Sequence, residues 1–297
     1  MDLSRIASII DVNRMQASHV TVVGNGGGAN LCRNLVRSGL GRIALVDFDR
    51  IEAVNICRQE HMIDGIGKSK AHALAAELLR INPDIQVECH ARDVRSFTDD
   101  EIDRYFGHTD LFVFAVDNVP ANARGNEVTL RLHTAAVWSG VYAGGRGGEV
   151  LFWHPHRRLP CYRCLCAARY RSWEQRTSEI PLTDSADVFS VQFVDSIAGM
   201  VAIGLLTRGA PNFYGQLIDQ LAARNFLHVK VHDWTWNGRD IIREQLCIPE
   251  DCDTFFTWNT AARRDPDGGQ PPCPDCTTFR APHLEQEGDV TAAVGGA

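Results

Sequence analysis

A glycine cluster near the N-terminus constrains the fold more than any other part of the sequence. Residues Thr21–Asn30 read Thr-Val-Val-Gly-Asn-Gly-Gly-Gly-Ala-Asn, a short apolar strand that passes through glycines directly into a helix. Glycine has no Cβ, so Gly24, Gly26 and Gly27 can take positive φ and let a ligand approach the backbone. A helix that starts near Gly28 points its positive dipole end at the same place. The segment predicts a phosphate-binding turn, although such turns occur in many α/β proteins.

Strand and helix patterns alternate over the first half of the chain. The run Leu111–Val116 is continuously apolar, as is typical of a parallel strand buried on both faces. We expect strands at residues 20–23, 43–46, 85–89, 111–116 and 135–141, with helices over 30–38, 68–81 and 121–133. This alternation predicts right-handed crossovers and an α/β fold with a doubly wound, mostly parallel Rossmann-like sheet.

The pattern changes after Gly144–Gly148. Residues 149–153 and 226–236 are expected to be strands, and Val188–Thr207 is expected to be a long helix. The polar, cysteine-bearing stretch Cys161–Arg176 is expected to be a loop. The second half therefore predicts an antiparallel C-terminal extension of the sheet.

Composition excludes several classes of protein. The chain has 297 residues, a net charge of −7 and no long basic run, so nucleic acid is not an expected partner. The N-terminus lacks the apolar core of a signal peptide, and the run Ile197–Leu206 is too short to span a bilayer. We expect a cytoplasmic protein with no membrane partner. In that compartment ten cysteines indicate metal binding or catalysis rather than disulfides.

Candidate ligand-binding residues follow three of the predicted strands, at one edge of the sheet. They are the glycine cluster, Asp47 and the pair Asp117-Asn118. Asp47 stands about twenty residues after the glycines, where an acidic side chain reaches the hydroxyls of a nucleotide ribose. A dehydrogenase fits these features as well as any other nucleotide-binding protein does.

The segment after Asp47 distinguishes a dehydrogenase from an enzyme that cleaves a triphosphate. Asn55, Arg58 and Lys70 follow within the next turns of chain, and two cations suit a site that splits a triphosphate better than one that transfers a hydride. Asp117 is then a candidate ligand for Mg²⁺, which takes one or two carboxylates beside substrate phosphates.

Together these motifs resemble the ThiF/MoeB/HesA family, the bacterial relatives of ubiquitin-activating enzymes. The resemblance covers about residues 14–280 and rests on Gly-x-Gly-Gly, Asp-Phe-Asp…Asn-x-x-Arg-Gln, Gly-x-x-Lys, Ile-Asn-Pro, Asp-Asn and two Cys-x-x-Cys pairs. It implies a usually homodimeric enzyme that uses ATP and Mg²⁺ to adenylate the C-terminal glycine carboxylate of a ubiquitin-like protein. It also implies catalytic roles for Arg58, Lys70 and Asp117, and nucleotide contacts from Gly24, Gly26, Gly27, Asp47, Asn55, Arg58, Lys70, Asp117 and Asn118.

The two cysteine pairs predict a structural metal site. Cys161 and Cys164 form one Cys-x-x-Cys pair, and Cys273 and Cys276 form the other. Each pair spans one edge of a tetrahedron, and two pairs make a closed four-thiolate Zn²⁺ site with no open position for catalysis.

The chain departs from the family pattern at three places. Ala29 replaces the last glycine of the loop, and Asn122 stands where an arginine is usual, with Arg124 as a possible substitute. No cysteine lies between residues 167 and 246, where members that form thioesters or persulfides carry one. Whether Cys166, Cys247 or Cys252 forms a thioester stays open, and a released or directly transferred acyl-adenylate is the expected product.

The sequence therefore predicts an ATP-dependent adenylyltransferase for a glycine-ended ubiquitin-like protein. It is expected to be one domain over residues 1–280, with a nucleotide-binding half at about 14–150 and a zinc and partner-binding half at about 151–280. The tail 281–297, which ends in Gly-Gly-Ala, is expected to be disordered. Two alternatives remain: adenylation of a short peptide or small carboxylate in natural-product synthesis, and a non-catalytic nucleotide-binding scaffold subunit.

Overall fold

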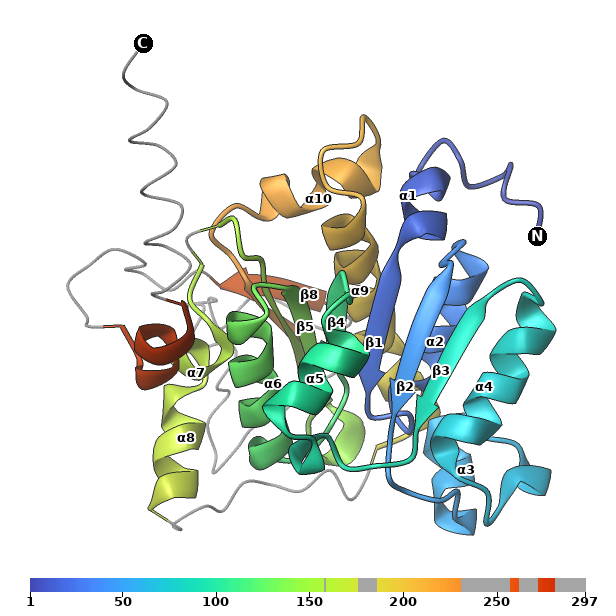
Figure 1. Cartoon of the computed structure of the whole chain (residues 1–297), viewed down its shortest axis with the longest axis horizontal. Helices are drawn as coiled ribbons and strands as arrows, with labels where there is room; N and C mark the ends of the chain where they lie inside the picture. The colour runs from blue at the N-terminus through green and yellow to red at the C-terminus, as the bar shows by residue number, and fades with distance from the viewer. Residues whose placement is uncertain (158, 176–185, 231–256, 262–271, 281–297) are drawn as a thin grey trace.

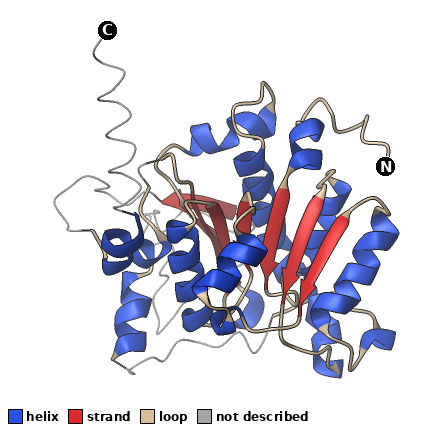
Figure 2. Cartoon of the chain, in the orientation of Figure 1, coloured by secondary structure: helices blue, strands red, loops and turns tan. Residues whose placement is uncertain are grey.

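The apolar runs of the first half form the centre of one twisted sheet, drawn in red in Figure 2. The structure, a computed structural model, describes residues 1–157, 159–175, 186–230, 257–261 and 272–280. The strands are β1 (His19–Val23), β2 (Arg42–Val46), β3 (Gln86–His90), β4 (Leu111–Phe114), β5 (Ala135–Val141), β6 (Gly147–Trp153), β7 (Phe226–Lys230) and β8 (Thr257–Ala261). Their spatial order is β3-β2-β1-β4-β5-β6-β7-β8.

The sheet changes character at β5. Strands β3, β2, β1, β4 and β5 are mutually parallel, whereas β6, β7 and β8 continue the sheet in antiparallel pairs. The predicted mostly parallel Rossmann-like sheet with an antiparallel extension is therefore confirmed. The strand expected over 226–236 is seen from Phe226 to Lys230, and its remainder lies outside the described residues.

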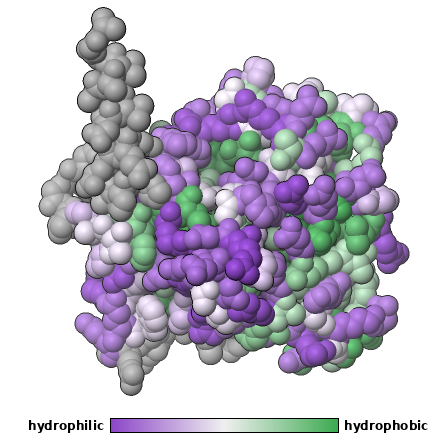
Figure 3. Space-filling view, viewed as in Figure 1, coloured by the Kyte–Doolittle hydropathy of each residue, from purple (hydrophilic) through white to green (hydrophobic). Residues whose placement is uncertain are grey.

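Helices cover both faces of the sheet (Figure 1). The α-helices are α1 (Val12–Ala17), α2 (Ala29–Arg37), α3 (Ile56–Gln59), α4 (Lys70–Ile81), α5 (Asp99–Phe106), α6 (Val119–Arg131), α7 (Tyr162–Leu165), α8 (Ala167–Glu174), α9 (Val188–Leu206) and α10 (Phe213–Leu221). Helices α4, α2 and α9 pack side by side on one face, and α5 and α6 lie on the other. Polar side chains gather over α5 and α6 in Figure 3, as expected for helices with one face in water.

Helix α9 is the most apolar helix that the structure describes. By length and composition it meets the criterion for a membrane span, which the shorter run Ile197–Leu206 does not. In the folded chain 56% of its apolar window is buried, and it packs against α2, α10, β5 and β6. These contacts make α9 the central helix of the core.

The prediction of a loop at Cys161–Arg176 is wrong, because α7 and α8 occupy most of that stretch. Tyr162, Cys166 and Tyr170 are all buried there and stand four residues apart. This spacing places the three side chains on one helical face, which packs on α6 and β6. The polar residues between them obscure the pattern in the sequence.

Candidate functional site

The register of the parallel strands brings the three predicted strand ends together. Val23 of β1 pairs with Val46 of β2 on one side and with Phe114 of β4 on the other. The chains that leave these strands therefore start side by side at one edge of the sheet. They line a cavity of about 810 Å³, whose walls include Gly24, Gly26, Gly27, Asp47, Arg58, Lys70, Asp117 and Asn118.

The glycine loop is closed on one side and open on the other. Gly24 has φ +91°, and a Cβ there would lie 2.3 Å from the carbonyl oxygen of Ala115. A Cβ on Gly26 would meet the side chain of Gln59 at 2.9 Å, but one on Gly27 would meet no atom of the described residues within 4 Å. Only glycine is therefore tolerated at position 24, while Gly27 leaves room in the cavity for a ligand.

Asp47 joins β2 to the glycine loop. Its Oδ2 accepts a hydrogen bond from the backbone N–H of Asn25 at 2.6 Å, and its Oδ1 accepts one from Asp49 at 2.8 Å. Burial raises the pKa of the Asp47 carboxyl, although these two N–H groups act against the rise. Each carboxylate oxygen keeps further acceptor capacity, so the side chain can also accept from a hydroxyl in the cavity.

Lys70 is held in place by an ion pair. It is the first residue of α4, its side chain is only 7% exposed, and its Nζ lies 2.9 Å from Oδ2 of Asp49. The pairing keeps the ammonium group in the wall of the cavity rather than in solvent. Arg58 reaches the same wall from α3, and Arg92 reaches it from the chain after β3.

Asn55 has a different position from the other predicted residues. It is buried, and its side-chain oxygen accepts from the backbone N–H of Glu52 at 3.0 Å in a capping box around the short 3₁₀ turn η1 (Ala53–Asn55). It is not among the residues that line the cavity. In this structure Asn55 shapes the turn that leads to Arg58.

Asp117 and Asn118 stand where β4 leads into α6. Asn118 is the N-cap of α6, and its Oδ1 accepts from the N–H of Ala121 at 2.9 Å. Asp117 lines the mouth of the cavity, where a carboxylate suits Mg²⁺. Arg124 faces away from this point: it donates to Asp99 at 2.6 Å and is not part of the cavity wall.

The antiparallel side of the cavity contains residues that the sequence did not single out. Glu149 of β6 is buried and accepts from Arg169 of α8 and from the hydroxyl of Tyr142. Burial works to raise the pKa of Glu149, but Arg169, Tyr142 and His228 together outweigh burial and leave that pKa lowered. A glutamate inside the apolar run Glu149–Trp153 was the available signal, since a buried charge requires a partner.

A second buried acid faces the other side of the cavity. Asp195, in the middle of α9, is 4% exposed, and its Oδ2 has no hydrogen-bond partner among the described residues. Burial raises the pKa of Asp195 well above its usual range, against the effect of a backbone hydrogen bond from Leu31. Burial therefore favours the protonated form of this carboxyl group in the folded chain.

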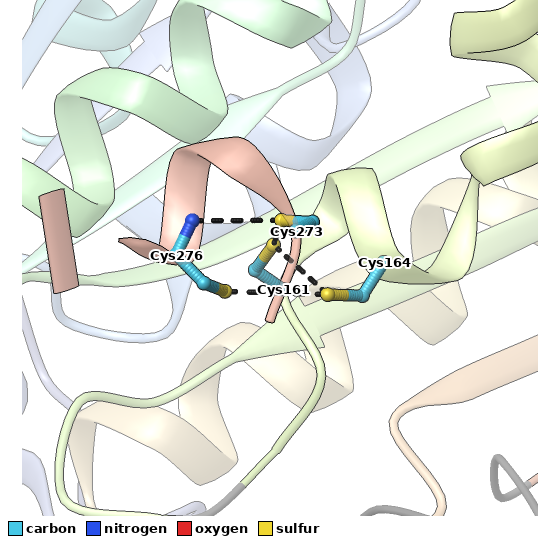
Figure 4. Close-up of side chains that lie close together, drawn as sticks. All are labelled: Cys161, Cys164, Cys273 and Cys276. Atoms are coloured by element: carbon cyan, nitrogen blue, oxygen red, sulfur yellow. Dashed lines mark hydrogen bonds between the residues drawn. The ribbon is translucent and has the colours of Figure 1, made fainter. Parts of the chain in front are cut away.

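The four predicted cysteine ligands converge, although Cys161 and Cys273 are 112 positions apart in the chain (Figure 4). Their Sγ atoms all lie within 4.8 Å of one another, with Cys161–Cys273 at 3.5 Å, Cys161–Cys164 at 3.7 Å and Cys164–Cys276 at 4.0 Å. A tetrahedral Zn²⁺ with Zn–S bonds of about 2.3 Å places its sulfurs about 3.8 Å apart, so the cluster fits zinc.

The cluster is tied to the rest of the fold through Asn126 of α6, which is fully buried. Its Nδ2 donates to Asp275 at 2.7 Å, and its Oδ1 accepts from the N–H of Tyr162 at 3.0 Å. One amide therefore links the two cysteine segments, α7 and the π-helical turn η5 (Cys276–Arg280), to the helix that begins beside Asp117.

Cys166 also lines the cavity but does not have the environment of a nucleophile. It is 5% exposed, and burial raises the pKa of its thiol to about 12. Reactive cysteines have lowered pKa values, so the environment of Cys166 is that of a residue that packs in the core. The other two cysteines considered for thioester formation, Cys247 and Cys252, lie outside the described residues.

Comparison with known proteins gives consistent results. A sulfur carrier protein adenylyltransferase of Thermus thermophilus is 34% identical over 157 residues, which are 51% of this chain and 56% of that protein. Ubiquitin-like modifier-activating enzyme 5 of Drosophila melanogaster is 32% identical over 180 residues, covering 55% of this chain and 43% of the relative. The chain thus spans about half the length of the relatives it matches.

Among solved structures, E. coli MccB with ATP superposes with a TM-score of 0.61 at 17% identity, over 84% of this chain and 65% of MccB. At that identity the likeness concerns the fold alone. The family match is more specific, since residues 3–231, well over half of the chain, match the ThiF family. With the fold, the strand-end residues and the sequence relatives in agreement, the chain belongs to the ThiF family, whose members adenylate carboxylates.

Proposed function

We propose that this chain is an ATP-dependent adenylyltransferase that activates the C-terminal carboxylate of a glycine-ended ubiquitin-like protein. One observation carries the proposal: Gly27, Asp47, Lys70 and Asp117 come from separate segments of the chain and line one cavity. The sulfur carrier adenylyltransferase and the ubiquitin-like modifier-activating enzymes among the relatives support this class of substrate.

In the proposed reaction a carboxylate oxygen attacks the α-phosphorus of ATP. The bond from that phosphorus to the bridging oxygen breaks, and pyrophosphate leaves with the electron pair. No general base is required because the carboxylate is already ionised. Lys70 and Arg58 would stabilise the phosphate charge, Asp47 would hold the ribose hydroxyls, and Asp117 would bind the Mg²⁺ that neutralises the phosphates.

The test is ATP–pyrophosphate exchange in the presence of a ubiquitin-like protein ending in Gly-Gly. Asp117→Ala should reduce exchange by roughly 10²- to 10³-fold, the usual effect of removing one electrostatic contact at a reacting phosphate. Because Asp117 is not buried, the variant should fold normally. Asp100→Ala is the matched control, since Asp100 is an exposed aspartate of α5 outside the cavity wall.

Each other outcome favours a stated alternative. Exchange that requires a short peptide and ignores the ubiquitin-like protein would support peptide adenylation. ATP binding without exchange for any acyl partner would support the scaffold subunit. The homodimer, the cytoplasmic location and the two-part division of residues 1–280 stay predictions, and the tail 281–297 lies outside the described residues.

A further inference from the structure

The cavity continues from the nucleotide residues to the antiparallel side of the sheet. We define its distal lobe by six residues that line it and that lie on or beside β5, β6, β7, α6 and α8: Asn122, Trp138, Tyr142, Glu149, Arg169 and His228. Because β6 starts at the edge where β5 ends, this lobe adjoins the strand ends that carry Asp117. A molecule in the distal lobe would therefore lie next to a bound triphosphate.

The distal lobe contains a cation in a fixed orientation. Both terminal nitrogens of Arg169 donate to the carboxylate of Glu149, with Nη2 at 2.6 Å from Oε2, and Tyr142 donates to the same oxygen at 2.8 Å. The pair uses two of the five N–H groups of the guanidinium. The Arg169 side chain is 32% exposed, whereas that of Glu149 is 6% exposed, so the arginine is the member that a ligand can reach.

Two buried acceptors in the same lobe lack partners within the described chain. Oδ1 of Asn122 and Nδ1 of His228 are both inaccessible and make no hydrogen bond there. His228 is 3% exposed and stacks on Phe226 with ring centroids 4.3 Å apart, so its ring cannot turn freely towards water. An unpaired buried acceptor is costly, and a ligand N–H could reach either atom only after the side chain moves into the cavity.

The remaining cations of the cavity wall come from the opposite side. Arg58, Lys70 and Arg92 all belong to the chain between the end of β2 and the start of α5, and Lys70 and Arg92 are paired with Asp49 and Glu101. Among the described residues, Arg169 is the cation that lines the antiparallel side. A carboxylate that approaches a triphosphate from this side is repelled by it. Because Arg169 is paired with Glu149, it offsets that repulsion through the N–H groups that the pair leaves available.

We propose that Arg169 binds the C-terminal carboxylate of the acyl substrate in the distal lobe and delivers it to the α-phosphate. The ligand is an extended peptide tail whose terminal carboxylate accepts from Arg169. This inference rests on the proposed adenylation and names the residue that recognises the acyl group. The Glu149–Arg169 pair then serves to orient the guanidinium as well as to attach α8 to β6.

The test uses the exchange assay with the Gly-Gly-ended protein and measures the KM for that protein separately from ATP affinity. Arg169→Lys keeps the charge and loses the planar fork, so the KM for the protein should rise roughly 10- to 100-fold, as for loss of a charge-assisted hydrogen bond. ATP affinity should stay within about 2-fold, because the nucleotide contacts are unchanged. Arg171→Lys, at an exposed position of the same helix, is the matched control and should change neither quantity.

A second variant distinguishes loss of substrate binding from a folding defect. The double variant Glu149→Gln/Arg169→Met removes both charges, so no uncompensated charge stays buried. It should bind ATP normally and show a KM for the protein at least as high as that of Arg169→Lys. Unchanged KM values in both variants would overturn the role of Arg169 while leaving adenylation intact. Absence of exchange by the unmodified chain would overturn both the proposed function and this inference.

Discussion

The two halves of the sheet assemble their functional residues in different ways. On the parallel side, Gly24, Asp47 and Asp117 each follow closely after a strand, and the strand register alone brings them together. On the antiparallel side, Glu149 and Arg169 are twenty residues apart on different elements, and the cysteine pairs are 112 residues apart. Local sequence therefore encodes the first half of the site, whereas tertiary contacts assemble the second.

Removal of the metal should have the largest effect, and it should affect the two halves of the sheet differently. Cys164→Ser takes one ligand from the cluster and should abolish zinc binding and lower the free energy of unfolding by about 3–5 kcal/mol, because the metal links α7 to η5. We expect the variant to keep ATP binding, which depends on the parallel half, and to lose binding of the acyl partner. Metal analysis, denaturant unfolding and ATP titration measure these effects.

Cys89→Ser is the control, since Cys89 is a half-buried cysteine outside the cluster. Simultaneous loss of ATP and partner binding in Cys164→Ser would contradict the comparison. It would mean that the two halves form one cooperative unit and that the division near residue 150 has no physical basis.

The glycine loop offers a test within the parallel half. Gly24→Ala combines a positive φ with a contact of 2.3 Å to a backbone oxygen, so it should lower the free energy of unfolding by about 3 kcal/mol. Gly27→Ala places its Cβ more than 4 Å from any atom in the described part of the chain, so it should change stability by less than about 0.5 kcal/mol, yet weaken ATP binding. Denaturant unfolding and ATP titration of both variants distinguish a structural from a ligand-facing glycine. Normal ATP affinity in Gly27→Ala would place the phosphates elsewhere.

The link between the halves should have an intermediate effect. Asn126→Ala leaves Asp275 and the N–H of Tyr162 without their buried partner, and each lost partner costs about 1–3 kcal/mol. We expect a destabilised protein that binds zinc more weakly, measured by thermal unfolding and competition with a chelator. Asn34→Ala, at an exposed position of α2, is the control. Unchanged zinc affinity in Asn126→Ala would show that the cluster holds its geometry without α6.

These contrasts explain how far the sequence could predict the molecule. Apolar runs and glycines identified the parallel strands and the residues after them, because both signals are local. The cysteine pairs were recognisable despite their separation, because metal ligands have a characteristic spacing. Arg169 and His228 carry no such spacing, and their importance depends on contacts made only after folding. Asn55 shows the converse: its motif was visible, but its side chain caps a turn outside the cavity wall.

Asp195 gives a pH-dependent test and reports on the boundary between the two halves. Its pKa is raised in the folded state by burial, and Glu60 beside α3 adds like-charge repulsion. Below about pH 4 the carboxyl is protonated in both the folded and the unfolded chain, so it makes no pH-dependent contribution. Between the unfolded pKa and the raised folded pKa, Asp195 is ionised in the unfolded chain but protonated in the folded chain, so stability falls as pH rises through this window.

Asp195→Asn abolishes this loss, since the amide has a similar shape and does not titrate. The variant should match the unmodified chain well below pH 4 and exceed it at pH 8 by about 1.4 kcal/mol in free energy of unfolding for each unit by which burial raises the pKa, measured by urea unfolding across that range. A difference that is constant with pH would mean that Asp195 ionises in the folded state, which requires a cationic partner that the described residues do not supply. A growing difference would show that the cavity keeps a carboxyl group between α9 and the glycine loop at a cost to stability, as expected of a residue retained for a ligand rather than for packing.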